Sequence, residues 1–372
     1  MANVPGLVPF SLFFVTYPLE TMLFNPLTLG ALTLPNRILL APLTRTRADA
    51  GHMPNDLMAE YYAQRASGGL LITECTMVAP HTSAFYAEPG IYSDAQIEGW
   101  KKVTSAVHAK GGRIFMQIWH AGRAAHPGLN DGERTVSSSA TAIEGDIQTP
   151  AGKVPQAVPH ALTAEEIPAI VAAYAQGAKN AIAAGFDGVE VHGANGYLID
   201  QFLRDTPNQR TDGYGGSIEN RARFLFEVLT AVTAAIGADK VGLRLSPLNS
   251  YNSMKDSDPL ALTTFLSEKL NAFNLAYLHL MRADFFGVQK GDVVTIARAH
   301  YKGVLIGNMG YTAEEAEAAI TEGKLDAVAF GTSFLANPDL PERIKAGAAL
   351  NAPDSNTFYT PGPKGYTDYP TL

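Results

Sequence analysis

The sequence is poor in cysteine, and Cys75 is the only one among its 372 residues. A single thiol excludes an intrachain disulfide framework and a thiol-rich metal site, and it is compatible with the reducing cytosol. The nine histidines also lack the HxxxH and HxH spacings that hold a metal ion. No uninterrupted apolar run reaches the roughly 18 residues that a membrane-spanning helix needs. We therefore expect a cytoplasmic protein that neither crosses a membrane nor binds a metal.

Positive charge is scarce as well. The chain has 28 Lys and Arg residues against 36 Asp and Glu residues, which gives a formal net charge of -8. Because there is no basic patch or arm, we do not expect nucleic acid as a partner. The first basic residue is Arg37, so the apolar start of the chain lacks the positive region of a signal peptide. We interpret residues 1–21 as a peripheral N-terminal extension, with Met22 as an alternative start.

Short apolar runs alternate with longer amphipathic segments from about Leu34 onward. Each run is nearly continuous in apolar residues, which is typical of a strand buried on both faces of a parallel sheet. This alternation predicts an α/β fold, a (β/α)8 TIM barrel formed as a single domain by residues 22–372. An open doubly wound sheet is the alternative, but the glycine-rich fingerprint that usually follows its first strand is missing here. The eight runs are Arg37–Pro42, Leu70–Thr76, Arg113–Trp119, Gly188–Gly193, Val241–Pro247, Tyr277–Arg282, Gly303–Asn308 and Ala327–Thr332.

Two of the amphipathic segments carry helix start signals. Thr163 with Glu166, and Thr312 with Glu315, have the spacing of capping boxes. In such a box the two side chains each accept a hydrogen bond from the other residue's backbone amide. The spacing therefore predicts helix starts at these two threonines.

Residues 126–162 interrupt the alternation after the third predicted strand. This segment is longer and richer in turn residues than a plain loop. Its stretch IEGDIQTPAGKV, residues 143–154, predicts a small hairpin over the mouth of the barrel. A substrate lid and a variable surface insertion are both open interpretations.

Among the polar side chains inside the predicted barrel strands, Gln117 and Arg244 are the most unusual, and functional residues of such barrels cluster at the carboxyl ends of the strands. Gln117 and Arg244 are poor core residues, because a buried polar group without a partner costs several kcal/mol. Arginine cannot lose its charge, so Arg244 implies an anionic or electron-rich neighbour. The alternative is an internal ion pair, for which Glu74 or Glu190 could supply the carboxylate.

Three further polar residues, His192, Asn195 and Tyr197, follow the fourth predicted strand. Histidine and asparagine both donate hydrogen bonds to an oxygen, and tyrosine is a weak acid with a pKa of about 10. Two neutral donors beside a phenol suit a carbonyl group that gains charge and then a proton. A lone histidine at a strand end is more often a satisfied core residue, but the Asn and Tyr beside this one favour a site.

Two glycine-bearing strand ends, IGNMG at Ile306–Gly310 and AFGTS at Ala329–Ser333, belong to the seventh and eighth predicted strands. Backbone amides at these two positions form the usual phosphate cradle of barrel enzymes. Together they indicate a phosphorylated cofactor or substrate.

The chain closely resembles the Old Yellow Enzyme family of FMN-dependent ene-reductases, from about Leu23 to Leu372. The main evidence is the long stretch VEVHGANGYLIDQFLRDTPNQRTDGYGGSIENRARF, residues Val189–Phe224. Supporting stretches are NRILLAPLTRTRA, MQIWHAGR, VGLRLSP, AVAFGTSFLANPDL and GYTDYPTL. Among its members, we expect the bacterial enzymes to be near relatives.

The resemblance implies a role for each strand-end residue. His192 and Asn195 match the pair that grips the activating oxygen of the substrate, and Tyr197 matches the proton donor. Phe358 and Tyr359 match an aromatic pair near the substrate mouth. The residues implied in FMN binding are Pro42 and Cys75 against the ring, Thr44 at O4, Gln117 and Arg244 at the pyrimidine end, and Asn308, Met309, Gly331 and Thr332 at the phosphate.

The implied activity is the reduction of activated alkenes, namely α,β-unsaturated carbonyl compounds and nitroalkenes, with NADPH or NADH as reductant. The implied protein is a monomer or homodimer. A nitrate-ester or nitroaromatic reductase with the same site, and a redox-silent phosphate-binding barrel, are the alternatives.

The chain departs from the family pattern at two positions. Thr332 stands where an arginine commonly clasps the FMN phosphate, which predicts weaker FMN retention, and Arg282 is the candidate to compensate for it. Cys75 stands where the family usually has Ala or Gly, and we expect it to be a small apolar filler.

Overall fold

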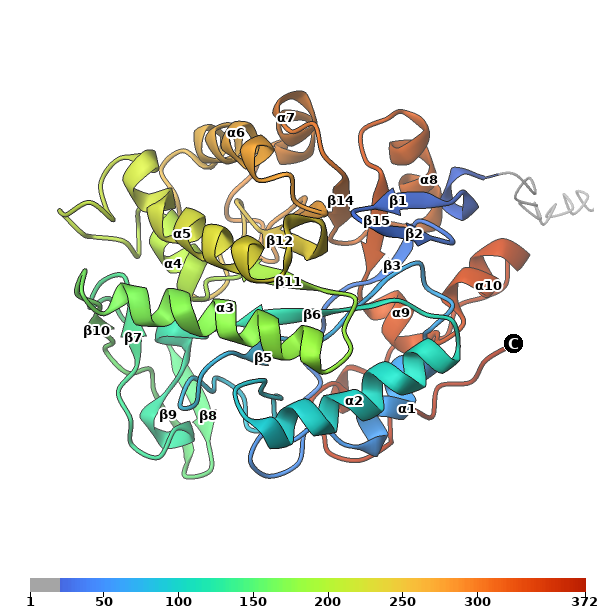
Figure 1. Ribbon diagram of the computed structural model, residues 1–372, viewed down its shortest axis with the longest axis horizontal. Coiled ribbons are helices and arrows are strands. Elements are labelled where there is room, and N and C mark those ends of the chain that lie inside the picture. The colour runs from blue at the N-terminus through green and yellow to red at the C-terminus, as the bar shows by residue number, and fades with distance from the viewer. Residues whose placement is uncertain (1–20) are drawn as a thin grey trace, which may run out of the picture.

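The computed structural model describes residues 21–372, so most of the predicted N-terminal extension lies outside the described residues. Eight parallel strands form a closed barrel, in which β15 pairs with β3 and β6 pairs with β11 (Figure 1). The predicted (β/α)8 fold is confirmed, and the open doubly wound sheet is wrong. The barrel strands are β3 (Ile38–Leu40), β4 (Leu71–Ile72), β6 (Ile114–Trp119), β11 (Gly188–Gly193), β12 (Val241–Leu245), β13 (Tyr277–Met281), β14 (Leu305–Asn308) and β15 (Ala327–Phe330).

The barrel strands are buried along their whole length, as their continuous apolar sequences predict. Helices surround them, and their apolar faces complete the core. No helix among residues 21–372 is long and apolar enough to span a bilayer. The helices are α1 (Asp56–Gln64), α2 (Asp94–Ala109), α3 (Ile167–Ala183), α4 (Leu198–Leu203), α5 (Ile218–Ile236), α6 (Pro259–Leu270), α7 (Val293–His300), α8 (Ala313–Thr321), α9 (Thr332–Ala336) and α10 (Leu340–Ala346).

One of the two predicted capping boxes forms. Thr312 and Glu315 exchange both hydrogen bonds at the start of α8. At α3 the prediction is wrong, since the helix begins at Ile167 and no side chain caps it. The Glu166 carboxylate does accept a hydrogen bond from the Thr163 amide at 2.8 Å. It is also bound by His160 at 2.7 Å and by an arginine of the insertion, and these partners are the reason that the box stays incomplete.

Two hairpins lie at opposite ends of the barrel (Figure 1). The hairpin of β1 (Leu27–Leu29) and β2 (Leu32–Leu34) precedes the first barrel strand. The predicted hairpin in the insertion is confirmed as β8 (Asp146–Thr149) paired with β9 (Gly152–Pro155). A short parallel pair, β7 (Val136–Ser137) and β10 (His160–Ala161), flanks it, and β5 (Thr76–Met77) extends the sheet beside β6.

A buried ion pair fixes the loop between β12 and α6, at the end of the barrel that carries the β8–β9 hairpin. The Arg221 guanidinium on α5 donates to the Asp256 carboxylate at 2.6 Å, and both side chains are buried. The same carboxylate accepts from the backbone amides of Asp205 at 3.1 Å and Asp258 at 3.0 Å. Removing one partner of such a pair leaves an uncompensated charge in the interior.

We expect Asp256→Ala to lower the free energy of unfolding by about 3–5 kcal/mol, because Arg221 stays buried without its carboxylate. Chemical denaturation of the purified variant measures this. Glu98→Ala is the matched control, since its ion pair with Lys101 is exposed, and exposed pairs contribute little. Equal midpoints for the two variants would contradict the prediction.

Candidate active site

His192 lies near the carboxyl end of β11, directly beside Arg244 in the sheet register. Its Nδ1 accepts a hydrogen bond from the Ala194 amide at 3.3 Å, so the ring proton resides on Nε2. Burial, together with the charges of Arg244 and His279, holds the pKa of His192 well below its usual value. The side chain is therefore a neutral donor.

Asn195 occupies a left-handed backbone conformation with φ of 56°, which asparagine tolerates better than most residues. The β12–α6 loop holds it there. Its amide donates to Ser246 Oγ at 2.8 Å, and its Oδ1 accepts from Asn249 at 2.8 Å. The Asn252 side chain donates to its carbonyl oxygen at 3.0 Å. Because Oδ1 is occupied in this way, Nδ2 is the group that Asn195 can offer to a further acceptor.

Tyr197 begins α4 and packs edge-on against two rings, those of Trp119 and His192, each at 5.1 Å between centroids. Among the described residues its hydroxyl has no hydrogen-bond partner. Burial raises the pKa of this hydroxyl well above its usual value. Tyr197 is therefore a protonated phenol beside two neutral donors, as the sequence predicts.

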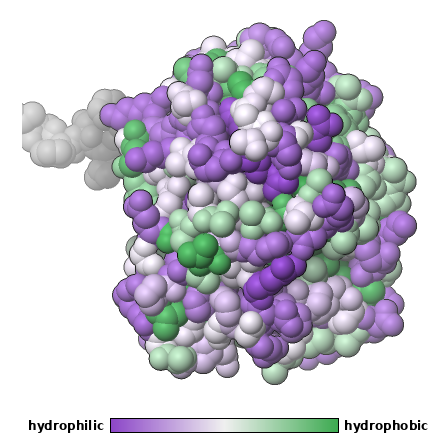
Figure 2. Space-filling model, turned by 90° about the vertical axis from the view of Figure 1, so that its left-hand side faces the viewer, coloured by the Kyte–Doolittle hydropathy of each residue, from purple (hydrophilic) through white to green (hydrophobic). Residues whose placement is uncertain are grey.

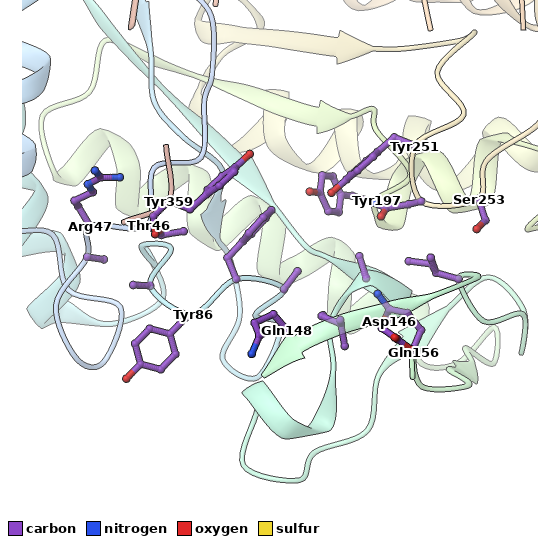
Figure 3. A pocket seen from close by; sticks show the side chains of 18 of the residues that line it. Thr46, Arg47, Tyr86, Asp146, Gln148, Gln156, Tyr197, Tyr251, Ser253 and Tyr359 are labelled. Atoms are coloured by element: carbon purple, nitrogen blue, oxygen red, sulfur yellow. The ribbon is translucent and has the colours of Figure 1, made fainter. Parts of the chain in front are cut away.

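A cavity of about 1250 Å³ opens above Tyr197. Its walls come from the loops after β3, β5, β12 and β13, from the β8–β9 hairpin and from the C-terminal segment. In Figure 3, Tyr197, Tyr251 and Tyr359 lie along one side of the cavity, and Asp146 and Gln148 of the hairpin lie on the other. Figure 2 shows the molecule from the left-hand side of Figure 1, and on this face polar and apolar side chains are interspersed.

Of the predicted substrate-site residues, Tyr197 and Tyr359 line this cavity. The hairpin forms part of its wall, which favours the interpretation that it bounds the substrate site. The predicted cofactor residues belong instead to the deeper strand ends, and among residues 21–372 none of them is part of the cavity lining.

Arg244 is the most unusual of these deeper residues, because its guanidinium is buried without an ion pair to any described carboxylate. One nitrogen donates to Asn308 Oδ1 at 2.8 Å, and another lies 3.5 Å from the Pro42 carbonyl oxygen. Its Nε has no partner within the described chain. The alternative prediction of an ion pair with Glu74 or Glu190 is therefore wrong.

The Glu190 carboxylate is held by a separate network inside the barrel. It accepts from Gln117 at 2.8 Å, from His279 at 2.8 Å and from the Tyr277 hydroxyl at 3.1 Å. Burial opposes ionisation, but the charge and hydrogen bond of His279, with Arg244 nearby, keep the pKa of Glu190 below its usual value. Gln117 thus gives its amide nitrogen to Glu190 and keeps its oxygen free for another donor. Sequence reasoning missed His279 and Tyr277 altogether, although their position in a barrel strand was visible.

Cys75 lies beside Thr44, with 3.2 Å between its Sγ and the threonine Oγ1. The thiol is buried and packs in a cluster that includes Trp119 and Tyr197. Burial raises the pKa of the thiol well above its usual value. Cys75 is therefore a neutral, enclosed side chain, in agreement with the expected filler.

The two predicted phosphate-binding strand ends have open backbone. Met309 and Gly310 adopt positive φ angles of 89° and 68°, and a Cβ added to Gly310 would meet nothing within 4 Å. Thr332 is exposed at the start of α9. Arg282 does not supply a free cation, because it donates to the Met309 and Gly310 carbonyls, both at 2.9 Å, and pairs with a glutamate of α8.

A closed barrel with a buried cation, neutral oxygen-binding donors and a phenol at its mouth has the architecture of a flavin oxidoreductase. Residues 22–351 match the NADH:flavin oxidoreductase / NADH oxidase family, and the chain belongs to it. The resemblance to the Old Yellow Enzymes is thereby confirmed, and the protein is an FMN-dependent oxidoreductase. The redox-silent barrel is wrong, whereas kinship with the bacterial members stays a prediction.

Three relatives illustrate this membership. A probable flavin mononucleotide-dependent alkene reductase of Leishmania infantum is 54% identical over 94% of this chain and 98% of its own length. The old yellow enzyme of Trypanosoma cruzi superposes with a TM-score of 0.91 at 47% identity, over 94% of this chain and 98% of that one. Morphinone reductase in complex with tetrahydroNAD has a TM-score of 0.90 at 46% identity, over 95% of this chain and 98% of that one.

Proposed function

We propose that this protein reduces the carbon–carbon double bond of α,β-unsaturated carbonyl compounds and nitroalkenes, with FMN as its cofactor and NADPH or NADH as reductant. The observation that carries the proposal is that the neutral donors His192 and Asn195 neighbour the protonated Tyr197, whose ring packs against His192 at 5.1 Å between centroids and lines the cavity. The morphinone reductase structure with tetrahydroNAD supports a nicotinamide reductant. A relative from rice, a putative 12-oxophytodienoate reductase, supports the same reaction class.

The deeper strand ends fit FMN. The unpartnered Nε of Arg244 offers a charged donor to an electron-rich ring edge, and Gln117 keeps an amide oxygen free there. The open backbone at Gly310 has room for a phosphate. The residues that would hold FMN are those predicted from the sequence: Pro42, Thr44, Cys75, Gln117, Arg244, Asn308, Met309, Gly331 and Thr332.

FMN held by these residues would supply the hydride for the reduction of the alkene, with NADPH or NADH as its own reductant. The side chains of His192 and Asn195 donate hydrogen bonds to the carbonyl or nitro oxygen, which becomes negative as the bond is reduced. Such donors lower the barrier because they bind the developing charge more strongly than the substrate. The Tyr197 hydroxyl then gives its proton to the α-carbon, and Tyr359 bounds the substrate.

We further propose a cytoplasmic monomer or homodimer with one barrel domain over residues 22–372 and a peripheral segment 1–21. The start of the family match at residue 22 supports this boundary. The single cysteine supports a reducing compartment.

Tyr197→Phe tests the proposed chemistry, because it keeps the ring and removes the acid. We expect the rate of 2-cyclohexenone reduction to fall by about 10²–10⁴, the range for loss of a general acid. Reduction of the bound cofactor by NADPH, followed separately by stopped-flow absorbance, changes little. Nitroalkenes lose less, because their nitronate anions are stable and water can protonate them. Enone turnover within a few-fold of the parent enzyme would assign the proton to another group.

Thr332→Arg tests the phosphate site. Thr332 is exposed and the Arg282 donors are occupied, so we expect an added guanidinium to tighten FMN binding by about 1–2 kcal/mol. Fluorescence titration of the apoprotein with FMN measures the dissociation constant. Thr332→Met is the matched control for chain length without charge. If the Arg and Met variants bind FMN equally, a different group neutralises the phosphate.

A further inference from the structure

The C-terminal segment 357–365 is fastened to the loop after β3 by two buried arginines. Arg45 and Arg47 are 0% and 4% exposed, and within the described part of the chain neither forms an ion pair. Burying a guanidinium without a carboxylate is costly unless its donors are satisfied. Carbonyl oxygens of the C-terminal segment satisfy most of them, and Arg45 Nη1 is the one guanidinium nitrogen of the two without a partner in the described chain.

Arg47 supplies most of this attachment. Its terminal nitrogens donate to the carbonyl oxygens of Phe358 at 2.7 Å, Thr357 at 2.8 Å and Lys364 at 3.2 Å. Its Nε donates to the carbonyl oxygen of Gly362 at 3.3 Å. One planar side chain thus bonds four carbonyls on both sides of a turn, so the turn cannot shift without breaking several hydrogen bonds.

The two residues before Arg47 add to the attachment. Arg45 donates to the Gly365 carbonyl at 2.7 Å and to the Phe358 carbonyl at 3.2 Å. The Thr46 hydroxyl donates to the carbonyl of Tyr359 itself at 3.0 Å. The backbone of Tyr359 is therefore held at its own carbonyl and at that of the preceding residue, Phe358.

The Tyr359 ring is exposed despite this rigid backbone, with 62% of its surface accessible. It lines the cavity and lies on the same side as Tyr197 (Figure 3). On one side it stacks on Phe85, at 6.3 Å between centroids and an interplanar angle of 13°. An aromatic ring that is backed by a second ring and fixed at its backbone presents a flat surface to whatever enters the cavity.

The cavity has room for more than the reacting alkene. Its volume of about 1250 Å³ lies above the upper end of ordinary ligand pockets, roughly 1,000 Å³. A substrate of one small ring at Tyr197 leaves the Tyr359 surface uncovered. A second planar group would cover it, and stacked aromatic pairs gain free energy beyond the area they bury.

We propose that Arg47, with Arg45 and Thr46, is a positioning residue that holds Tyr359 as a stacking surface. The enzyme accordingly prefers activated alkenes that carry a planar aryl group distal to the reacting double bond. The reduction of these alkenes rests on the proposed function, whereas the preference for binding a planar aryl group does not.

The test compares two substrates that differ in the distal group alone, N-phenylmaleimide and N-methylmaleimide, with the FMN-loaded enzyme. We expect kcat/KM to favour the phenyl compound, and Tyr359→Ala to reduce this preference by about three- to tenfold, mainly through KM. Tyr359→Phe retains the preference because it keeps the ring. Val158→Ala also retains it, since Val158 is exposed outside the cavity lining.

The positioning role is tested by variants that leave Tyr359 in place. Arg47→Gln removes most of the N–H donors that bind the C-terminal carbonyls, and we expect it to reduce the phenyl preference as Tyr359→Ala does. Arg47→Lys keeps a charged donor, and we expect it to retain part of the preference. If Arg47→Gln compromises folding, Thr46→Ala removes only the hydrogen bond to the Tyr359 carbonyl and Thr46→Ser restores it. A phenyl preference that is unchanged in Tyr359→Ala, or in both Arg47→Gln and Thr46→Ala, would overturn the inference.

Calorimetric titration with N-phenylsuccinimide and N-methylsuccinimide, which are already saturated, separates this inference from the proposed function. The ratio of their dissociation constants is expected to follow the same order across the variants. If the enzyme reduces neither maleimide but the succinimide ratio depends on Tyr359 and Arg47, the proposed function fails and the stacking surface stands. If the succinimide ratio is the same in every variant, the stacking surface is wrong.

Discussion

The buried guanidinium of Arg244 is the constraint on which the rest of the site depends. A permanent charge inside a barrel is unfavourable unless it is partnered, and residues 21–372 provide only Asn308 and the Pro42 carbonyl. The nearest barrel carboxylate, Glu190, is bound by Gln117 and His279. The site therefore keeps a buried guanidinium whose Nε has no partner in the described chain and can be met by an electron-rich cofactor.

The neutral state of the neighbouring groups follows from this charge and from burial. His192 stays unprotonated because it is buried beside Arg244, and so it acts as a donor whose charge does not change with pH near neutrality. Tyr197 keeps its proton because burial disfavours the phenolate. Asn195 takes its strained conformation because Ser246 and Asn249 hold it. Each donor is thus fixed in place before the substrate arrives, which reduces reorganisation during the reaction.

Local patterns predicted the barrel well, because buried parallel strands must be continuous apolar runs and the carboxyl ends of such strands meet at one face. For this reason His192 and Arg244 were both predicted on barrel strands, and the structure shows that they are neighbours in the sheet register. Both capping boxes were predicted from spacing, but only the one at Thr312 forms, because Glu166 has partners in the insertion that spacing does not reveal.

Contacts between distant segments could not be predicted. The hydrogen bond from Arg47 to Phe358 joins residues 311 positions apart, and no periodicity encodes it. The same holds for the partners of Arg244, for which an internal ion pair was the alternative interpretation. Glu190 was visible as a charge within an apolar strand, but its choice of His279 over Arg244 depends on side-chain geometry across the barrel.

The midpoint potential of bound FMN in Arg244→Met tests the central claim most directly. If the unpaired Arg244 charge faces the cofactor, its removal disfavours the negative reduced form, so the potential falls and FMN binds more weakly than in the parent enzyme. Arg282→Met is the matched control, because the Arg282 donors go to backbone carbonyls and to a glutamate, and it leaves the potential near that of the parent. An unchanged potential in Arg244→Met, measured on fully loaded protein, would contradict the account.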